Sequence, residues 1–354
     1  MKLILKPYQA KGFAQGISTS RDLFDAQGIL LLAKGEIVTP RVLELLIAHK
    51  VYILQYELDK AIPPKCFSKE QYQNVLVSMQ DIYQGANLVT EEKLMATIDV
   101  VDGIIDELTE NPRIYFDLNQ FRNFDNYTYV HSVNVGLLAT LIAIEMGYRD
   151  EQLKELTLGA LLHDLGKMTI PSEILNKPGG LTSQEFEILK QHPLRGVELL
   201  REVKVSQEVL AGICQHHERW NGQGYPDRLR SDAIHRNAQV IAVADVFDAI
   251  TADRPYHDGM PPYHALELVI AGFGNDFAPE VVLALRNSLV IYPENSYVKL
   301  NTGEIGVVVA IPPNFPTRPL IRIFFDKYGN FTQEETIVDL LLDLTRFIST
   351  VDFQ

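Results

Sequence analysis

The sequence contains almost no cysteine, and this absence excludes two kinds of protein. Only Cys66 and Cys214 occur in 354 residues. Two thiols cannot form a framework of several disulfides, and they cannot supply the three or four thiolates of a structural zinc site. We interpret both as small, buried apolar residues.

Long apolar runs are missing as well. A membrane-spanning helix needs about 20 mainly apolar residues, whereas the apolar stretches at residues 29–33 and 338–342 are much shorter. The first residues also lack the pattern of a signal peptide. We therefore predict a soluble, cytoplasmic protein with no membrane partner.

An excess of basic residues is absent too. The chain has 46 Asp and Glu against 32 Lys and Arg, a formal net charge of −14, and a pI of about 5.1. Long nucleic acids and anionic membranes both require a basic protein surface. The charge therefore argues against long nucleic acid as the main partner.

What is present is an ordinary globular composition, with 46% hydrophobic and 22% charged residues. Changes in hydrophobic period and in Pro and Gly content divide the chain into four parts. We predict a mainly α protein, with a small mixed α/β N-terminal unit of accessory or regulatory kind and a β-rich C-terminal appendage. The four parts are an N-terminal accessory unit at 1–60, a helical connector at 65–124, an all-helical domain at 125–290 and the β-rich extension at 291–354.

Local signals place several elements within these parts. Ser68, Thr90 and Thr182 are predicted helix caps, and Pro193 suits the first position of a helix. Strands are predicted at residues 28–32, 297–300, 306–309 and 321–325.

The all-helical part concentrates histidine and aspartate at helix ends. A single histidine in such a place is usually a hydrogen-bonded core residue, but several near one another indicate a metal site. Imidazoles with carboxylates and no thiolate suit iron, manganese, cobalt, nickel or zinc, and a carboxylate that can bridge favours two metal ions. The residues concerned are His131, His163, Asp164, His192, His216, His217 and Asp245.

The order of these motifs resembles that of the HD-GYP phosphodiesterases, which belong to the HD-domain metal-dependent phosphohydrolases. The resemblance covers roughly residues 120–290. The motifs that carry it are HDLGK at 163–167, HPLRG at 192–196, HHERWNGQGYP at 216–226, ADVFDA at 244–249 and RPY at 254–256. It implies an HD-domain helical bundle. Residues 11–56 and 291–340 are also similar, less specifically, to domains that accompany this one in relatives.

The resemblance implies a ligand set for two ions. One ion is matched to His131, His163, Asp164 and Asp245, and the other to His192, His216, His217 and the second oxygen of Asp164. It further implies a hydroxide bridging the two ions, with iron or manganese as the metals that suit these ligands best. Some relatives have a glutamate that recruits a third metal at the position of Tyr127, so a phenol there favours two ions.

The remaining predicted site residues surround this centre. Asp164 and Lys167 are the predicted catalytic residues, with a solvent-exposed Lys167 as the alternative. Arg254 is matched to a ligand-binding arginine, or it pairs with Asp248 or Asp253. The other predicted substrate contacts are His257, Tyr225 and Trp220. His257 replaces a common basic residue of the family. The alternatives are that Tyr225 packs under the helices that carry the metal ligands and that Trp220 packs beside the loop at 221–226. Glu218 is predicted to accept a hydrogen bond from His217 or its neighbours, as metal-bound imidazoles usually require.

The resemblance implies a metal-dependent phosphodiesterase that hydrolyses cyclic di-GMP to pGpG, GMP or both. Two alternatives stay open at this point: a catalytically slow cyclic di-GMP receptor, and a hydrolase of another cyclic dinucleotide. In the family, the loop at Gly224–Pro226 is implicated in contacts with diguanylate cyclase (GGDEF) domains. The helices of the connector could also pair two chains in a homodimer.

Overall fold

The computed structural model describes residues 23–24, 29–33, 36, 39, 41–42, 67–84, 89–110, 127–252, 259–294 and 296–352. Of the predicted N-terminal unit it describes a short antiparallel pair, β1 (Leu23–Phe24) and β2 (Leu30–Leu32). The strand predicted at 28–32 is confirmed for Leu30–Leu32. Apart from residues 29, 33, 36, 39 and 41–42, the rest of the N-terminal unit lies outside the described residues, as does Cys66.

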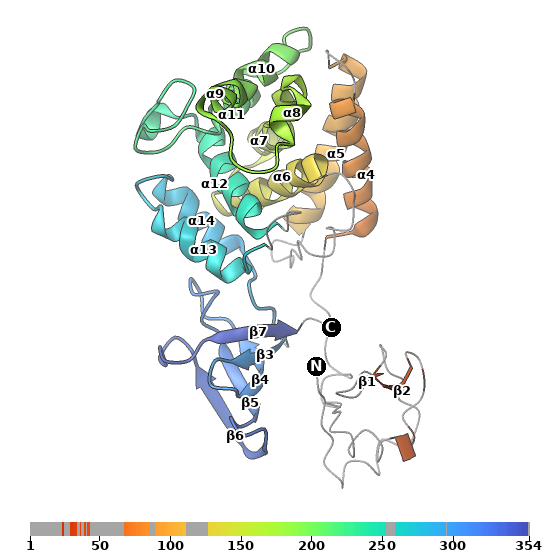
Figure 1. Cartoon of the computed structure of the whole chain (residues 1–354), viewed down its shortest axis with the longest axis vertical. Coiled ribbons are helices and arrows are strands. Elements are labelled where there is room, and N and C mark those ends of the chain that lie inside the picture. The colour runs from red at the N-terminus through yellow and green to blue at the C-terminus, as the bar shows by residue number, and fades with distance from the viewer. Residues whose placement is uncertain are drawn as a thin grey trace.

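Helices make up most of the rest of the described chain up to residue 288, which confirms the predicted fold class (Figure 1). The longer ones are α4 (Lys69–Gln84), α5 (Glu91–Glu110), α6 (Tyr127–Glu145), α7 (Asp150–Leu162), α10 (His192–Leu199), α11 (Gln207–Gln215), α12 (Arg236–Thr251), α13 (Pro262–Ala271) and α14 (Pro279–Ser288). The shorter ones are η1 (Leu165–Thr169), α8 (Ser172–Leu175), α9 (Ser183–Leu189) and η2 (Ser231–Ala233).

The predicted caps start these helices as expected. The Ser68 and Thr90 hydroxyls accept backbone N–H bonds at the starts of α4 and α5. Thr182 and Glu185 form a complete capping box at the start of α9. Pro193 is the second residue of α10 rather than the first, because His192 already belongs to the helix.

Helix α6 is the centre of the helical domain. From Val130 to Ala143 its residues are buried on every side, as expected of a helix that other helices surround. Helices α4 and α5, drawn in orange in Figure 1, lie against α6 and α7, and they share a hydrophobic core with both. The two helices predicted as a connector therefore pack on the helical domain itself.

The C-terminal appendage is β-rich, as predicted, and its strands form an antiparallel sheet. Its strands are β3 (Tyr297–Leu300), β4 (Ile305–Ala310), β5 (Leu320–Phe325), β6 (Phe331–Asp339) and β7 (Ile348–Asp352), and their spatial order is β6-β5-β4-β3-β7. The three predicted strands are confirmed, and β6 and β7 are additional. Buried residues of this sheet continue the core that α6, α12 and α14 form.

Within the described ranges, no helix is both long enough and apolar enough to cross a membrane.

Candidate metal centre

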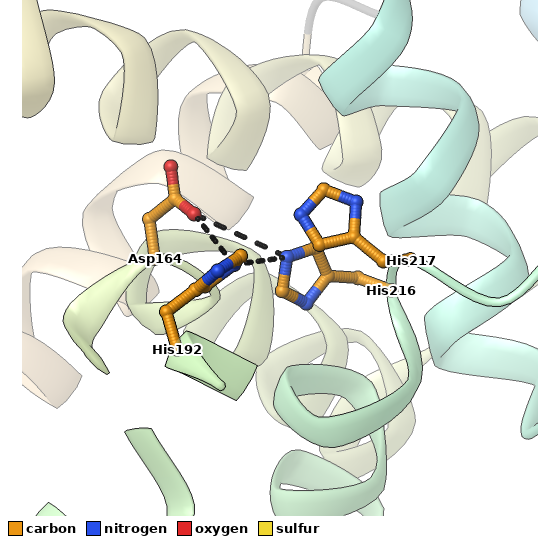
Figure 2. Close-up of side chains that lie close together, drawn as sticks. All are labelled: Asp164, His192, His216 and His217. Atoms are coloured by element: carbon orange, nitrogen blue, oxygen red, sulfur yellow. Dashed lines mark hydrogen bonds and ion pairs between the residues drawn. The ribbon is translucent and has the colours of Figure 1, made fainter. Parts of the chain in front are cut away.

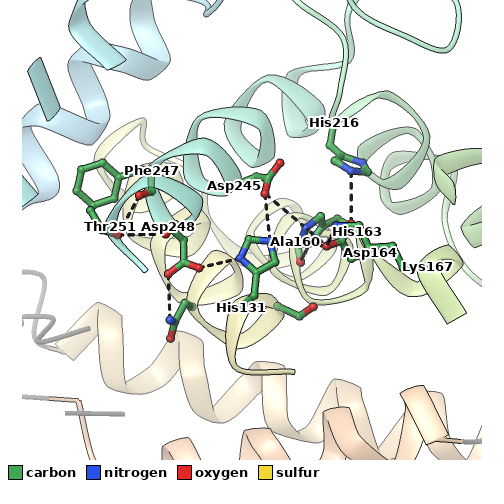
Figure 3. A network of polar contacts seen from close by, with 12 residues as sticks. His131, Ala160, His163, Asp164, Lys167, His216, Asp245, Phe247, Asp248 and Thr251 are labelled. Carbon is green, nitrogen blue, oxygen red and sulfur yellow. Dashed lines mark hydrogen bonds and ion pairs between the residues drawn. The ribbon is translucent and has the colours of Figure 1, made fainter. Parts of the chain in front are cut away.

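The seven predicted metal ligands come together within the helical domain (Figures 2 and 3). Most of them lie where a helix begins or ends, so their side chains project into the gap between elements. They are His131 in α6, His163 at the end of α7, Asp164 before η1, His192 at the start of α10, His216 and His217 after α11, and Asp245 within α12.

A glycine allows two of these segments to come together. A Cβ on Gly166 would lie 1.9 Å from the carbonyl oxygen of His192 and 2.5 Å from the nitrogen of Gly196. Any side chain at residue 166 would therefore push η1 away from α10. The glycine in the HDLGK motif thus places Asp164 against His192, across 28 residues of sequence.

The first group of ligands surrounds one oxygen of Asp164. Asp164 Oδ2 lies 3.3 Å from His163 Nε2 and 3.6 Å from His131 Nε2. Asp245 Oδ1 lies 3.1 Å from His131 Nε2 and 4.0 Å from His163 Nε2. We call these four residues the first group.

The second group surrounds the other oxygen of Asp164. Asp164 Oδ1 lies 3.3 Å from His192 Nε2 and 4.0 Å from His216 Nε2, and His217 lies beside them (Figure 2). The residues His192, His216, His217 and Asp164 form the second group. A single carboxylate therefore faces both groups, with a different oxygen toward each.

Backbone carbonyls set the orientation of three imidazoles. The Nδ1 atoms of His163, His192 and His216 lie 2.7–2.8 Å from the carbonyl oxygen three residues earlier in each case. A carbonyl can only accept, so each Nδ1 carries a proton and, in a neutral ring, Nε2 presents a lone pair to the site. Since the Nε2 atoms of His192 and His216 are only 3.3 Å apart, their lone pairs face each other.

This donor set fits divalent metal ions. His163 Nε2 and Asp164 Oδ1 are buried and have no hydrogen-bond partner within the structure. Buried polar atoms normally have partners, and converging imidazole nitrogens and carboxylate oxygens are the ligands of iron, manganese and zinc. A cation between them satisfies both unpartnered atoms.

A carboxylate fixes the orientation of His131, and the sequence analysis did not assign this role to it. Asp248 Oδ2 lies 2.7 Å from His131 Nδ1, and Asp248 Oδ1 accepts a bond of 3.0 Å from Asn134 Nδ2 (Figure 3). Such a carboxylate partner orients a ligating imidazole and increases its basicity. Asp248 lies one helical turn after Asp245, and this spacing is a signal that could have identified it.

The two groups differ in their proton affinity. Burial lowers the pKa of His131, but its bonds to Asp245 and Asp248 outweigh burial and raise the pKa to about 10. Burial lowers the pKa of His217 to about 3, and burial together with the neighbouring imidazoles holds the pKa of His216 well below its usual value. The first group is therefore rich in negative charge, whereas the second group consists mainly of neutral rings.

Asp164 remains ionised between the two groups. Burial alone would raise its pKa, but electrostatic interactions with the neighbouring His163 and Lys167 side chains hold the pKa well below its usual range. Lys167 Nζ lies 2.5 Å from Asp164 Oδ2, and its side chain is partly exposed. The predicted catalytic lysine is thus located beside the cluster, on its accessible side.

The loop that contains Tyr225 folds back over His217. The rings of Tyr225 and His217 stack with their centroids 4.7 Å apart. A Cβ on Gly224 would lie 2.4 Å from the backbone nitrogen of Arg219, so only glycine permits this close return. Tyr225 and His217 both line a cavity of about 730 Å³, which Lys190 and Arg228 also line. Tyr225 therefore both packs on a predicted ligand and faces a cavity.

The contacts of Trp220 are with the backbone of neighbouring segments and with the hydrophobic core. Its backbone nitrogen donates to the carbonyl of Asp276, its carbonyl accepts from Ser231, and its ring packs against the hydrophobic core. It is not among the residues that line the cavity beside Tyr225. These contacts favour packing beside the loop over substrate contact.

The structure contradicts the role predicted for Glu218. Its carboxylate accepts backbone N–H bonds from Asp227, at 2.7 Å, and Leu229, at 3.1 Å. Both oxygens thus bind the loop that follows residue 226, because the chain turns back and brings those amides to a buried acid. Glu218 thus contacts this loop rather than one of the predicted metal-ligating imidazoles.

Three residues named in the sequence analysis cannot be placed, because Arg254, His257 and the Tyr127 side chain lie outside the described residues.

Comparison with known proteins agrees with this geometry. Residues 113–281 match the model of an HD domain, and residues 297–354 match that of a KOW domain associated with HD domain. A cyclic di-GMP phosphodiesterase of Pseudomonas aeruginosa is 36% identical over 243 residues, covering 68% of this chain and 58% of that protein. A 3′3′-cGAMP-specific phosphodiesterase of Vibrio cholerae is 40% identical over 134 residues, covering 38% of this chain and 31% of that protein.

The solved structure of an HDG"Y"P protein from Bdellovibrio bacteriovorus has a TM-score of 0.51 and 21% identity, covering 77% of this chain and 95% of that one. This likeness concerns the fold. The chain spans less than two thirds of the two curated relatives. The matched domain models and the order of the motifs nevertheless agree with the resemblance found in the sequence, and residues 113–281 form an HD domain.

Proposed function

We propose that this chain is a metal-dependent phosphodiesterase that hydrolyses cyclic di-GMP to pGpG, GMP or both. The observation that carries the proposal is Asp164, whose two oxygens face two separate groups of imidazoles and carboxylate. The name of the Pseudomonas aeruginosa relative supports cyclic di-GMP as the substrate. Two further relatives, from Thermotoga maritima and Xanthomonas campestris, are 41% and 40% identical and are also named cyclic di-GMP phosphodiesterases.

The proposed cofactors are two divalent metal ions, with iron or manganese best suited to the ligands. His131, His163, Asp164 and Asp245 would hold one ion, and His192, His216, His217 and Asp164 the other. When bound, such ions neutralise charge on a phosphodiester and make a water molecule a better nucleophile. The carbonyl-bonded rings of His163, His192 and His216 contribute fixed Nε2 lone pairs, so the site needs little rearrangement to bind cations.

Around this centre the chain would bind and orient the substrate. Lys167 places an ammonium group beside Asp164, where it can pair with an oxygen of the scissile phosphate. Arg254 and His257 are proposed to contact the second phosphate or a guanine. Tyr225 contributes a ring at the wall of the adjoining cavity, where a nucleobase can stack.

A second substrate has a specific observation in its favour. Relatives from Vibrio cholerae that are 33–40% identical are named 3′3′-cGAMP-specific phosphodiesterases. The two substrates differ in one base, so the contacts that distinguish them involve base edges rather than the metal centre. A slow cyclic di-GMP receptor is the remaining alternative, and a complete ligand set argues against it.

Partners and location are also proposals. The loop at Gly224–Pro226 is proposed to contact diguanylate cyclase (GGDEF) domains, and homodimerisation is proposed through the outer faces of α4 and α5. The scarcity of cysteine supports a cytoplasmic location.

The test is product analysis after metal loading. The protein is purified without oxygen, loaded with Fe²⁺ or Mn²⁺, and incubated with cyclic di-GMP, with 3′3′-cGAMP, and with equal amounts of both. Asp164→Ala is the control. Metal-dependent formation of pGpG or GMP, absent in the control, is the expected result. Binding of cyclic di-GMP without turnover would support the receptor alternative. Preferential hydrolysis of 3′3′-cGAMP would make that dinucleotide the substrate in place of cyclic di-GMP.

A further inference from the structure

A buried series of hydrogen bonds connects helix α4 to the first group of ligands. The Tyr72 hydroxyl donates to Asn134 Oδ1 at 2.9 Å, Asn134 Nδ2 donates to Asp248 Oδ1 at 3.0 Å, and Asp248 Oδ2 lies 2.7 Å from His131 Nδ1. The series spans three helices, α4, α6 and α12. Tyr72 is 59 residues before His131 in the sequence and outside the span that matches the HD domain.

We propose that Tyr72 is a positioning residue for the metal centre, acting through Asn134 and Asp248 on the imidazole of His131. The inference rests on the proposed metal site and extends it to a helix that the domain match does not include. Helix α4 is then part of the catalytic unit rather than a connector to it.

The donor and acceptor chemistry of these four side chains fixes the direction of each hydrogen bond in the series. Asp248 is a carboxylate and can only accept, so the amide nitrogen of Asn134 must face it. The amide oxygen of Asn134 therefore faces α4, where the Tyr72 hydroxyl donates to it. At the other end the carboxylate accepts from His131 Nδ1, which leaves Nε2 to face Asp164 and Asp245.

Burial makes each link depend on the next. Tyr72 is 0% exposed, Asp248 1%, Asn134 3% and His131 5%. Water cannot replace a lost partner at such positions, so removing one group leaves the next with an unpaired polar atom. Without the hydroxyl of Tyr72, the amide oxygen of Asn134 has no donor from α4, and the amide can rotate away from Asp248.

The core position of Tyr72 does not by itself require a hydroxyl. Its ring packs among Val75, Met79 and other apolar residues of the core that α4 shares with α6 and α7. A phenylalanine retains the ring and its apolar contacts, and it lacks the hydroxyl that donates to Asn134. Tyr72→Phe therefore removes the first link and leaves the packing intact.

The experiment is a Mn²⁺ titration of the metal-free full chain, with unbound Mn²⁺ followed by electron paramagnetic resonance. His131→Gln and His217→Gln identify which binding step belongs to the first and second groups. Tyr72→Phe is expected to weaken binding at the first group by between about twofold and tenfold, the loss of one hydrogen bond, and to leave the second group unchanged.

The matched control is Thr97→Val, which also removes one buried hydroxyl and keeps the side-chain volume. Thr97 lies in α5, is buried, and its hydroxyl contacts the Ser78 hydroxyl of α4 and donates to the Lys93 carbonyl, rather than contacting a group bonded to a ligand side chain. This variant is expected to lose a comparable amount of thermal stability while retaining both Mn²⁺ affinities. A second readout is the double variant Tyr72→Phe/Asn134→Ala, which should weaken Mn²⁺ binding no further than Asn134→Ala alone.

Three outcomes would overturn the inference. If Tyr72→Phe lowers the melting temperature but leaves both Mn²⁺ affinities unchanged, the hydroxyl has only a structural role. If the losses in the double variant add, Tyr72 does not act through Asn134. A wild-type chain that binds no Mn²⁺ would overturn the metal centre and this inference together, whereas failure to hydrolyse cyclic di-GMP with two Mn²⁺ bound would overturn only the proposed substrate.

Discussion

The two groups of ligands that share Asp164 are held in place by different means. In the first group, His163 binds the carbonyl of Ala160, whereas side chains orient His131: Asp248 binds its Nδ1, and Asn134 binds Asp248. In the second group, the Nδ1 atoms of His192 and His216 bind carbonyls one turn earlier in their own chain segments. Local backbone geometry thus orients His192 and His216, whereas contacts between distant helices orient His131.

The difference extends to charge. Two carboxylates, Asp245 and Asp248, bracket His131 and raise its pKa to about 10, whereas burial lowers the pKa of His217 to about 3. The first group therefore favours a positive charge at its centre more strongly. We expect it to bind a divalent cation more tightly than the second group, which offers mostly neutral ligands.

The largest effect is expected from the residue that belongs to both groups. Asp164→Ala should abolish binding of both ions and reduce turnover of cyclic di-GMP to that of the metal-free chain, because each group loses a ligand oxygen. Metal content by mass spectrometry and helical content by circular dichroism are the measurements. Asp232→Ala, at an exposed carboxylate, is the control. Retention of two ions by Asp164→Ala would contradict the shared-ligand assignment.

Asp248→Asn should separate the groups. An asparagine has one acceptor oxygen and no charge, so it cannot accept from both His131 and Asn134. Removal of such an outer partner typically reduces metal affinity by about 10–100-fold, and we expect this at the first group only. Calorimetric titration with Mn²⁺ measures both affinities, and Asp276→Asn, far from the cluster in sequence, serves as the control. Equal weakening of both groups would mean that they are not independent.

The metal-free chain should have opposite pH dependence at the two groups. A raised pKa means that the contribution of His131 to stability is complete below the unfolded value of 6.5 and is lost as the pH rises through about 10. A lowered pKa means that the unfolded chain takes up the proton of His217 first, so stability is lost as the pH falls from 6.5 toward about 3.

Melting temperatures in chelator should therefore be highest near neutral pH. With about 1.4 kcal/mol for each pKa unit, each arm of the curve is expected to change the free energy of unfolding by a few kcal/mol. His131→Gln should flatten the alkaline arm and His217→Gln the acidic arm, whereas His264→Gln, at an exposed ring, should change neither. Identical curves for the first two variants would eliminate the contrast between the groups.

The smallest effect is expected for Glu218→Gln. The glutamine retains one acceptor oxygen, so one of the bonds to Asp227 and Leu229 is lost, at a cost of about 1–3 kcal/mol in the free energy of unfolding. Metal affinity at both groups should stay unchanged, because Glu218 contacts the loop rather than His217. Chemical denaturation and Mn²⁺ titration measure the two quantities. A weaker second group would restore the role first predicted from the sequence.

Much of the fold could be predicted because its signals are local. The hydroxyls of Ser68, Thr90 and Thr182 mark helix starts by their spacing from the first apolar residues, and all three cap helices here. Strand β6 escaped prediction because Thr332, Gln333 and neighbouring glutamates interrupt its apolar pattern. Its place in the sheet comes from pairing with β5, and no residue within β6 specifies that partner.

The metal centre shows the same division. The ligand types, and their places at helix ends, could be predicted because each motif is short and contains its own histidines and aspartates. The partner of His131 and the task of Glu218 could not be predicted. Both depend on which buried donor a carboxylate meets after the chain turns, and a local pattern does not contain that information.

The sequence by itself determined the helical and strand segments, the donor chemistry and the glycines that allow close approach at residues 166 and 224. Only the tertiary structure decided which nitrogen of each imidazole faces the centre, which oxygen of Asp164 faces each group, and that Tyr72 connects to His131. The physical reason is range: capping and periodicity act over a few residues, whereas Tyr72 and Asn134 are 62 residues apart and meet only because α4 and α6 share one hydrophobic core.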